Sequence, residues 1–303
     1  MAITPSTDTD EHQSTKDLPD NRGRWGLNDQ LGTLNLITDA ARARAAAEVR
    51  TGRAVSLAQA IEPALLGSGP DAPVSQPASP VQQVLTYTGS PAIAAVDVIT
   101  VANHHRGSTH IDALVHVPHN GQVYPGRPLS ESLTSGGVAH ASTTAFAAGI
   151  VTRGVLLDLA SDGPLAPRYA ITARDLEAAE QRQGVRLEAG DALVVRSGWT
   201  GGPQPGKAMP GISLDAVRWI HQRGAALFAG DAGDAHPPLD PACPLPLHQV
   251  ALPLMGMPLI DVAELEELAT VCAGLNRWSF LLTVAPPRIH GLTGVPVNPI
   301  AIF

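Results

Sequence analysis

The 303-residue chain has little of what would place it in several common classes of protein. It contains only two cysteines, Cys243 and Cys272, which excludes a disulfide scaffold and a cysteine-rich zinc module. Charged residues make up 16% of it, the formal net charge is −8, and no long basic run exists, so we expect no nucleic-acid partner. It also lacks a membrane-length apolar run and the apolar stretch of a secretion signal, so we expect a cytoplasmic protein without a membrane partner.

The chain nevertheless has enough apolar residues to bury a full hydrophobic core. Hydrophobic residues make up 44% of it, although aromatic residues contribute only 4%. The 29 glycines and 27 prolines indicate frequent turns, so long uninterrupted helices are not expected. Residues 1–22 are polar and have no apolar periodicity, which predicts a mobile tail ahead of a single domain over residues 23–303.

Short helix and strand patterns alternate along the chain and predict a mixed α/β fold, with a central mixed sheet flanked by helices. Residues 62–92 are rich in proline, glycine, serine and alanine, and are expected to form a long loop or cover segment. Helices are predicted over 38–50, 172–184, 213–223 and 261–272, and strands over 54–60, 97–116 (strand, turn, strand), 154–160, 191–198 and 278–285, with a further short apolar run at 225–229.

Histidine is concentrated in one part of the chain, because six of the 11 lie between residues 104 and 140. His110 and Asp112 are two residues apart, so in a strand both side chains point to one face. Imidazole and carboxylate are common protein ligands of zinc and similar divalent ions. In a straight strand His116 would lie about 20 Å from His110. It can join the same site only if the chain turns after Asp112, and one helical turn would make these two residues neighbours.

Each of these residues also has a simpler interpretation. A histidine on an apolar face is commonly just packed or exposed, and Asp112 could cap a turn. His119 and His140 are interpreted as surface residues. The chain contains no Gly-x-Ser-x-Gly, no Gly-x-Gly-x-x-Gly and no phosphate-binding loop, so neither a serine nucleophile nor a nucleotide cofactor is expected.

Longer motifs extend the pattern over nearly the whole chain after the polar tail. They are Arg24-Trp25-Gly26-x-Asn28-Asp29-Gln30-Leu31-Gly32-Thr33-Leu34-Asn35, Gly121-x-x-Tyr124, Arg196-Ser197-Gly198-Trp199, Pro246-Leu247-His248, Met255-Gly256-Met257-Pro258-Leu259 and Gly291-x-x-Gly294-x-Pro296-Val297-Asn298-Pro299. With Thr109-His110-x-Asp112-x-x-x-His116, they resemble the "putative cyclase" family, which includes bacterial kynurenine formamidase and isatin hydrolase and has the motif His-x-Gly-Thr-His-x-Asp-x-Pro-x-His.

The resemblance implies a metal-dependent hydrolase or cyclase with a swivelling β/β/α domain, assembled as a homodimer or homotetramer. Within the site it implies metal ligands at His110 and Asp112, a further motif histidine at His116, and downstream functional residues at His248 and Asp261.

The chain departs from the family motif at three positions. Arg106 stands where the family has its first histidine, and His105 is one position away, so a bulge at Gly107 would be needed to bring it to the site. Leu114 replaces the motif proline. Asp261 stands where many relatives carry glutamate, and its reach is one methylene shorter.

Several candidates have structural alternatives. Asp261 with Glu264 is also typical of a helix N-terminus, and His248 lies in a Pro-flanked apolar run where it could be a buried histidine bonded to the backbone. Candidates for the substrate pocket are Trp25, Arg106, Asp231 and Trp199, although Asp231 could simply belong to an acidic turn and the tryptophans to the core.

The expected function is hydrolysis of a small amide, lactam or lactone. One divalent ion, Zn²⁺ or Mn²⁺, would sit on His110 and Asp112, with Asp261 or His105 completing the ligands, and a metal-bound hydroxide would attack the carbonyl. His116 or His248 would move the proton, or would instead hold a second ion. The alternatives are cyclisation or dehydration of a polyketide-type intermediate at the same site, and a metal-free binding protein in which Arg106 replaces the charge of the ion.

Overall fold

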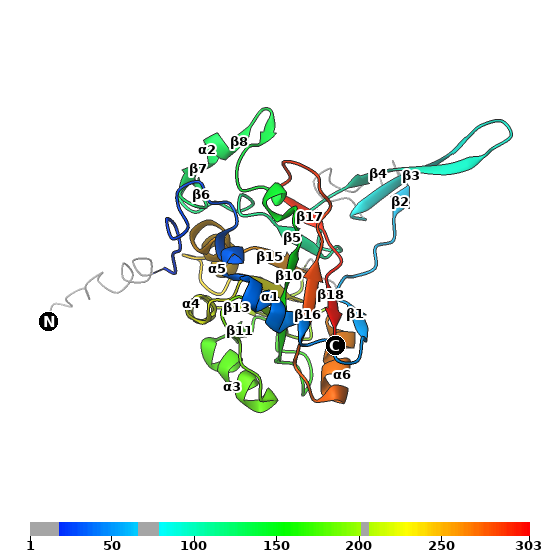
Figure 1. Cartoon of the computed structure of the whole chain (residues 1–303). Helices are drawn as coiled ribbons and strands as arrows, with labels where there is room; N and C mark the ends of the chain where they lie inside the picture. The colour runs from blue at the N-terminus through cyan, green and yellow to red at the C-terminus, as the bar shows by residue number, and fades with distance from the viewer. Residues whose placement is uncertain (1–17, 66–78, 201–205) are drawn as a thin grey trace.

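A nine-stranded sheet forms the centre of the computed structural model, which describes residues 18–65, 79–200 and 206–303 (Figure 1). Its middle strands, β10, β12, β14 and β15, run parallel, and antiparallel strands extend it on both sides. This arrangement confirms the predicted mixed α/β fold. In spatial order the strands are β1 (Ala54–Ser56), β18 (Ile300–Ile302), β16 (Ser279–Val284), β10 (Ile150–Asp158), β12 (Ala192–Arg196), β14 (Leu227–Gly230), β15 (Leu259–Asp261), β5 (His110–Asp112) and β17 (Gly294–Pro296).

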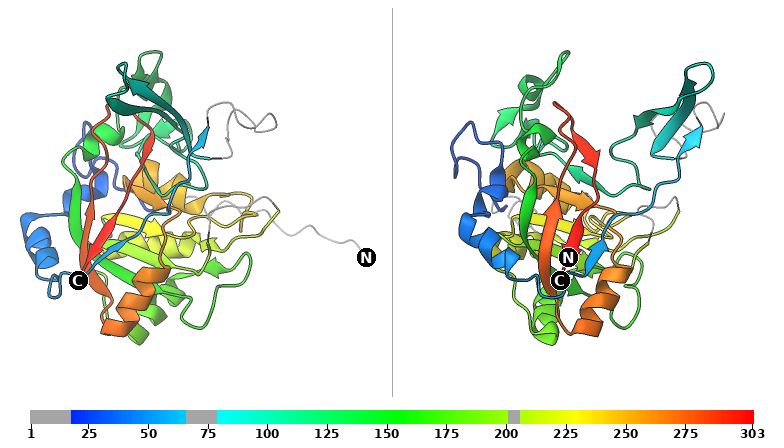
Figure 2. Two further views of the ribbon diagram at one scale, coloured as in Figure 1. Left: turned by 90° about the vertical axis from the view of Figure 1, so that its right-hand side faces the viewer. Right: turned by 45° about the vertical axis from the view of Figure 1, so that its right-hand side comes forward.

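Helices cover the sheet and leave its middle strands buried. The helical elements are η1 (Gly32–Leu36), α1 (Asp39–Ala46), α2 (Leu129–Ser132), η2 (Thr143–Phe146), α3 (Ala173–Gln183), α4 (Leu214–Arg223), α5 (Pro246–Val250), the π-turn η3 (Ala251–Met255) and α6 (Glu266–Leu275). Helices α1 and α3 pack against β10, and α6 packs against β1 (Figure 2). Residues 155–157 of β10 and 192–195 of β12 are buried apolar runs, as is typical of parallel strands covered on both faces. None of the described helices is long and apolar enough to cross a bilayer.

Capping residues set the helix boundaries largely where the sequence predicts them. Thr172 and Asp175 form the expected capping box at the start of α3, and Ser213 caps α4. Helix α1 ends at Ala46, earlier than predicted. The last helix begins at Glu266 and not near Asp261, because Asp261 is the final residue of β15. The helix-cap interpretation of Asp261 is therefore wrong.

The prediction of a loop over residues 62–92 is wrong for its second half. Strands β3 (Val81–Thr88) and β4 (Ala94–Val101) pair along their whole length and project from the body, as Figures 1 and 2 show. The short β2 (Ala64–Leu65) pairs with the base of β3. The Gly89-Ser90-Pro91 composition thus belongs to a hairpin turn. Residues 66–78 of the predicted loop lie outside the described residues.

The sequence predicts a mobile tail up to residue 22, but the packed part of the chain begins before residue 23. Asn21 is buried, and its backbone N–H donates to the Leu254 carbonyl while its side-chain amide donates to that of Met255. Residues 1–17 of the predicted tail lie outside the described residues. The remaining short strands are β6 (Gln122–Val123), β7 (Arg127–Pro128), β8 (Leu133–Thr134), β9 (Gly137–Val138), β11 (Ala170–Ile171) and β13 (Gly211–Ile212).

Candidate metal centre

Strand β5 supplies the two central residues of the site. His110 and Asp112 share one face, as predicted, with 3.6 Å between His110 Nε2 and Asp112 Oδ1, while Ile111 enters the core on the other face. β5 lies between β15 and β17, so Asp261 is opposite His110 and Gly294 is opposite Asp112. Pairing on both sides fixes the register of β5 and therefore the positions of both side chains.

His116 returns to the site because the chain turns directly after β5. The backbone N–H of His116 donates to the Ala113 carbonyl, which closes a tight turn in place of the predicted helical turn. The turn leaves 4.0 Å between His116 Nε2 and Asp112 Oδ2. The prediction that the chain must turn after Asp112 is thus confirmed.

His104, which the sequence did not single out, also contacts the central carboxylate. Its Nδ1 lies 2.8 Å from Asp112 Oδ1, and its ring stacks on that of His116 with 3.7 Å between centroids. Gly294 makes room for this ring, because a Cβ at that position would overlap the His104 imidazole. The Gly291-x-x-Gly294 motif was the available sequence signal for this contact.

His105 and Arg106 do not take the position of the family's first histidine. Turns over residues 103–107 absorb two extra residues, so His104 faces Asp112. The ring of His105 instead accepts a hydrogen bond from the Gly107 backbone, and Arg106 is exposed. Within the described residues, neither belongs to a group with the geometry of a metal site. The expectation that a bulge at Gly107 brings His105 to the site is therefore wrong, because the chain turns here and presents His104 instead.

A second group of side chains meets Asp112 from the opposite end of the sequence. His248 lies on α5, and its Nε2 is 3.0 Å from Asp261 Oδ2 and 3.4 Å from Asp112 Oδ2. Asp261 therefore reaches the site in spite of its short side chain. Two groups of possible metal ligands share Asp112, namely His104 with His110, and His248 with Asp261.

Asp234 holds His248 from behind. Its carboxylate accepts hydrogen bonds from the backbone N–H groups of Leu247 and His248, and its Oδ2 lies 2.6 Å from His248 Nδ1. This contact directs Nε2 of His248 towards Asp112 and Asp261. A carboxylate behind a histidine is the usual arrangement that orients a metal-binding imidazole. His110 is oriented similarly, because its Nδ1–H donates to the Ser108 carbonyl at 2.8 Å.

The central carboxylate has the properties of a cation ligand. Asp112 is completely buried, and although imidazole nitrogens approach both of its oxygens, none of these contacts has the geometry of a hydrogen bond. The Oδ1 atom of Asp261 and the Nδ1 atom of His104 are also buried without one. Such atoms cost free energy unless a partner compensates them. Imidazole nitrogens and carboxylate oxygens converging on this space fit a divalent ion such as Zn²⁺ or Mn²⁺.

Burial and charge set opposite protonation preferences for the site histidines. Burial lowers the pKa of His116 to about 4, so this ring is neutral at pH 7. Burial also acts to lower the pKa of His248, but the carboxylates of Asp261, Asp112 and Asp234 hold it well above its usual value. Burial would raise the pKa of Asp112, yet the surrounding imidazoles hold it well below its usual range. The site thus contains an ionised carboxylate that favours positive charge beside it.

Comparison with known proteins identifies the family of the chain. The model of a family described as "Putative cyclase" matches residues 45–236, which is most of the chain and includes His104, β5 and Asp234. The chain belongs to the putative cyclase family. A comparison with curated proteins gives no match.

Several solved structures share this fold. A protein described as a novel cyclase is 31% identical over 94% of this chain and 100% of its own, with a TM-score of 0.80. Isatin hydrolase A from Labrenzia aggregata is 18% identical over 82% of this chain and 93% of its own, with a TM-score of 0.59. A potential metal-dependent hydrolase with cyclase activity is 13% identical over 82% of this chain and 98% of its own, with a TM-score of 0.51. Family membership and the His/Asp groups together support an enzyme that uses a divalent metal.

A small cavity adjoins the second ligand group of this cyclase-family site. It has a volume of about 180 Å³ and is lined by Asp231, Asp234, His236, His248 and Asp261, with an apolar wall that includes Met209 and Leu245. Of the four residues predicted for the substrate pocket, Asp231 lines this cavity. Trp25, Arg106 and Trp199 are not among its described lining residues.

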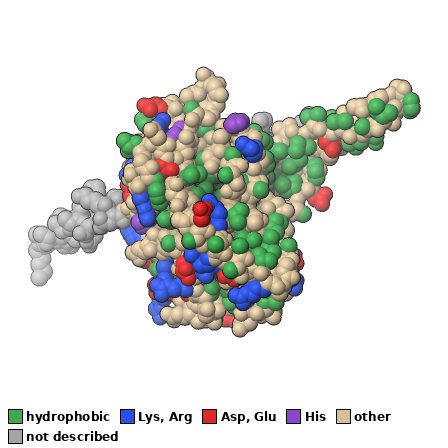
Figure 3. Space-filling view, in the orientation of Figure 1, with side chains coloured by type: hydrophobic (Ala, Val, Ile, Leu, Met, Phe, Trp, Pro, Cys, Tyr) green, Lys and Arg blue, Asp and Glu red, His purple; other side chains and the backbone are tan. Residues whose placement is uncertain are grey.

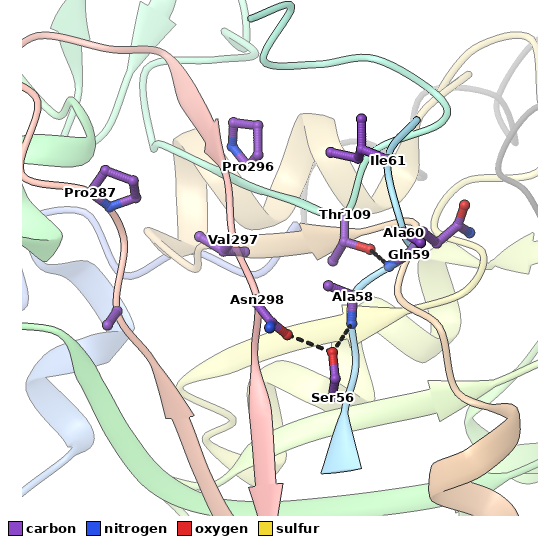
Figure 4. A pocket seen from close by; sticks show the side chains of 11 residues that line it. Ser56, Ala58, Gln59, Ala60, Ile61, Thr109, Pro287, Pro296, Val297 and Asn298 are labelled. Carbon is purple, nitrogen blue, oxygen red and sulfur yellow. Dashed lines mark hydrogen bonds between the residues drawn. The ribbon is translucent and has the colours of Figure 1, made fainter. Parts of the chain in front are cut away.

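A larger hollow of about 530 Å³ lies elsewhere, between residues 56–61 and 296–298 (Figure 4). Its walls include Ala58, Ile61, Thr109, Pro296 and Val297, and the Ser56 hydroxyl donates to Asn298 across its floor. None of the candidate metal ligands lines it. Among the candidate ligands, His248 and Asp261 line the smaller cavity.

Asp231 is held in its place by the loop after β12. Its carboxylate accepts hydrogen bonds from the backbone N–H and hydroxyl of Ser197 and from the N–H of Gly198. Burial nevertheless raises the pKa of Asp231 from 3.8 to about 6, and these hydrogen bonds only partly oppose the shift. Asp231 therefore joins the loops after β12 and β14 beside the cavity.

This raised pKa predicts a pH-dependent contribution to stability. Because Asp231 binds its proton more tightly in the folded chain, its contribution is fully present below pH 3.8 and is lost as the pH rises through about 6. The loss is about 3 kcal/mol over this range. We expect the difference in unfolding free energy between the wild type and Asp231→Asn, from urea titrations, to change by that amount. If the unfolding free energies of the two proteins changed in parallel with pH, the raised pKa of Asp231 would be contradicted.

Proposed function

We propose that this protein is a metal-dependent hydrolase that acts on the carbonyl of a small amide, lactam or lactone. The observation that carries the proposal is the completely buried carboxylate of Asp112, whose unpartnered oxygens are shared by two groups of possible ligands. His104, His110 and Asp112 would hold one divalent ion, and Asp112, His248 and Asp261 form the alternative or additional place for one. When bound, Zn²⁺ or Mn²⁺ would make water acidic and polarise the substrate carbonyl.

The histidines of the site would divide positioning and proton transfer between them. His116 is neutral at pH 7, is partly exposed and lies beside Asp112, so it can accept a proton from water and return it to the leaving group. Asp234 would fix the ring of His248, so that its Nε2 stays directed at the two carboxylates.

The cavity size favours a small substrate. A volume of about 180 Å³ lies below the roughly 300–1,000 Å³ of typical sites for drug-sized ligands. Its wall is mainly apolar, while Asp231 and His236 offer polar contacts. A compact cyclic imide, lactam or N-formyl amide fits this description, and we propose cleavage of a C–N bond. Isatin hydrolase, whose structure shares the fold, is named for hydrolysis of such a cyclic compound.

The metal-free binding hypothesis loses its motivation. It rested on Arg106 occupying a ligand position, but Arg106 is exposed, and His104 occupies that place. A guanidinium therefore does not replace the charge of an ion at Asp112.

Metal content tests the proposal, and two neighbouring histidines provide a matched pair. We expect about one or two ions of zinc or manganese per chain by elemental analysis of the purified or reconstituted protein. His104→Ala should lower the affinity for the metal ion at least tenfold, whereas His105→Ala should leave that affinity unchanged. Hydrolysis of N-formyl amides, cyclic imides and lactams would then be screened. Absence of metal after reconstitution would overturn the proposal.

Replacing Asp234 tests how His248 is positioned. Asp234→Asn keeps the size of the side chain but weakens its hold on His248 Nδ1, so we expect a 10–100-fold loss in metal affinity or activity. Asp240→Asn is the control, because Asp240 is exposed and lies outside both ligand groups. Metal titration and turnover check the prediction. Equal values for the two variants would remove Asp234 from the site.

A further inference from the structure

Gly233, in the loop after β14, lines the small cavity directly beside two of the candidate metal ligands. A Cβ added at this glycine would lie 3.1 Å from Asp261 Oδ1 and 3.6 Å from His248 Cε1. Asp261 Oδ1 is one of the buried atoms without a hydrogen-bond partner, and both ligand residues line the same cavity. The missing side chain of Gly233 therefore leaves space beside these two ligands.

The backbone itself does not require a glycine at this position. The φ angle of Gly233 lies outside the left-handed region, in contrast to that of Gly32 or Gly256. Other residues adopt such a conformation without strain. A side chain at position 233 would thus change the cavity and not the backbone. A glycine of this kind is typical of a place where the backbone approaches a ligand closely.

The loop that carries Gly233 is held on both sides and cannot easily move away. The Asp231 carboxylate ties it to the loop after β12, and the Asp234 carboxylate ties it to the start of α5. The carbonyl of Gly233 accepts the backbone N–H of Ile212 at 2.8 Å. Across the cavity wall, Asp261 is fixed at the end of β15, which pairs with β14 and β5. A side chain at position 233 would therefore narrow the cavity.

Selection among small substrates depends on the residues of the cavity itself. Apolar side chains also gather along the projecting hairpin of β3 and β4, as Figure 3 shows, but none of the described hairpin residues lines the cavity. The cavity has only about 180 Å³, so one added methyl group matters. Its apolar wall, which includes Met209 and Leu245, suits an apolar ring.

We propose that Gly233 determines the substrate specificity of this site, by admitting a flat ring against the bare backbone beside Asp261 and His248. A peptide unit is planar, so without a side chain it offers a flat surface to a planar ligand. The class of ligand is a planar cyclic imide or lactam fused to an apolar ring, and the apolar wall would cover that ring. This inference rests on the proposed function, because it concerns the same cavity.

Binding of two probes to the metal-loaded protein tests the proposal. Succinimide is a small cyclic imide, and phthalimide adds a fused benzene ring to it. We expect the wild type to bind phthalimide more tightly in isothermal titration calorimetry. Gly233→Ala should lower the affinity for phthalimide at least tenfold, because one methyl group alters the fit in a small pocket by about that much. Its affinity for succinimide should fall far less.

Gly233→Val should exclude phthalimide altogether. Because valine could unfold the loop, the alanine variant keeps the test open, and circular dichroism verifies that each variant is folded. Gly136→Ala is the matched control, because Gly136 is exposed, has no left-handed φ and lies outside the cavity. An added Cβ there makes only an ordinary contact, 3.6 Å from the Thr134 hydroxyl, so both affinities should stay unchanged.

Equal affinity changes for the two probes in folded Gly233→Ala would overturn the proposal, as would loss of the metal ion from that variant. Turnover separates this inference from the proposed function. Binding that depends on Gly233 without hydrolysis of either imide would support the inference and contradict imide hydrolysis. Hydrolysis with the same kcat/KM ratio for the two imides in the wild type and Gly233→Ala would support the hydrolase and overturn the role of Gly233. A wild type that binds neither probe would also overturn it.

Discussion

Asp112→Asn is expected to abolish metal binding and to lower kcat/KM by roughly 10³-fold, the equivalent of several kcal/mol of transition-state stabilisation. The substitution preserves shape but removes the negative charge around which four histidines gather. It also converts one buried oxygen into an amide donor that would point at ring nitrogens or at the ion. No other described carboxylate belongs to both ligand groups, so none can replace Asp112.

Two measurements distinguish loss of the ion from loss of the fold. Added Zn²⁺ or Mn²⁺ should raise the melting temperature of the wild type, because an ion that binds only the folded chain stabilises it. That rise should vanish in Asp112→Asn, while the metal-free variant still unfolds cooperatively. Asp162→Asn, at an exposed loop position, should behave as the wild type. A variant at Asp112 that keeps both metal and activity would remove this residue from the centre of the site.

Gly32→Ala is expected to destabilise the fold by about 3–5 kcal/mol, combining the cost of a left-handed non-glycine residue with overpacking. Gly32 has φ +57°, and an added Cβ would overlap the Gly256 carbonyl oxygen and lie 2.6 Å from its carbon. That carbonyl also accepts the backbone N–H of Thr33 at 2.8 Å. Since both sides of the contact are backbone, neither can move away cheaply. The loss is a large share of the roughly 5–15 kcal/mol that stabilises a typical domain.

Gly52→Ala separates the two causes. Gly52 has φ +73° but open space around a built Cβ, so its substitution should cost only the backbone term of about 1–2 kcal/mol. Urea unfolding of the two variants and the wild type gives the comparison. Equal destabilisation by the two substitutions would show that the contact with Gly256 relaxes freely.

Local patterns of the sequence predicted what depends on local chemistry. The capping box of Thr172 and Asp175 and the cap at Ser213 fixed the starts of two helices, since a cap requires only neighbouring residues. The alternation of His110, Ile111 and Asp112 likewise fixed which side chains share a face. The turn after Asp112 was predicted because a straight strand would place His116 too far from His110 to share a site.

Other parts of the site depend on contacts between distant segments, and the sequence did not reveal them. His104 reaches Asp112 because Gly294, on another strand, leaves room for its ring. The sequence did not single out Asp234, because its contact with His248 joins the loop after β14 to a separate helix, α5. Asp261 matched a helix cap locally, but pairing with β5 made it the end of a strand. Strand β3 was mistaken for a loop because the turn composition of the residues around it was extended to the strand itself.

The position of β5 between β15 and β17 has a consequence for the order of events during synthesis. This three-residue strand follows the hairpin of β3 and β4 early in the chain, yet both strands that hold it come from residues 259–261 and 294–296. Pairings across such long stretches of sequence form slowly, because the intervening chain must first be closed into a loop. A growing chain on the ribosome can therefore display His110 and Asp112 for most of its synthesis without a fixed place for either. The carboxylates and imidazoles come together only when the last segment emerges, so an ion would enter a finished sheet and not a nascent one.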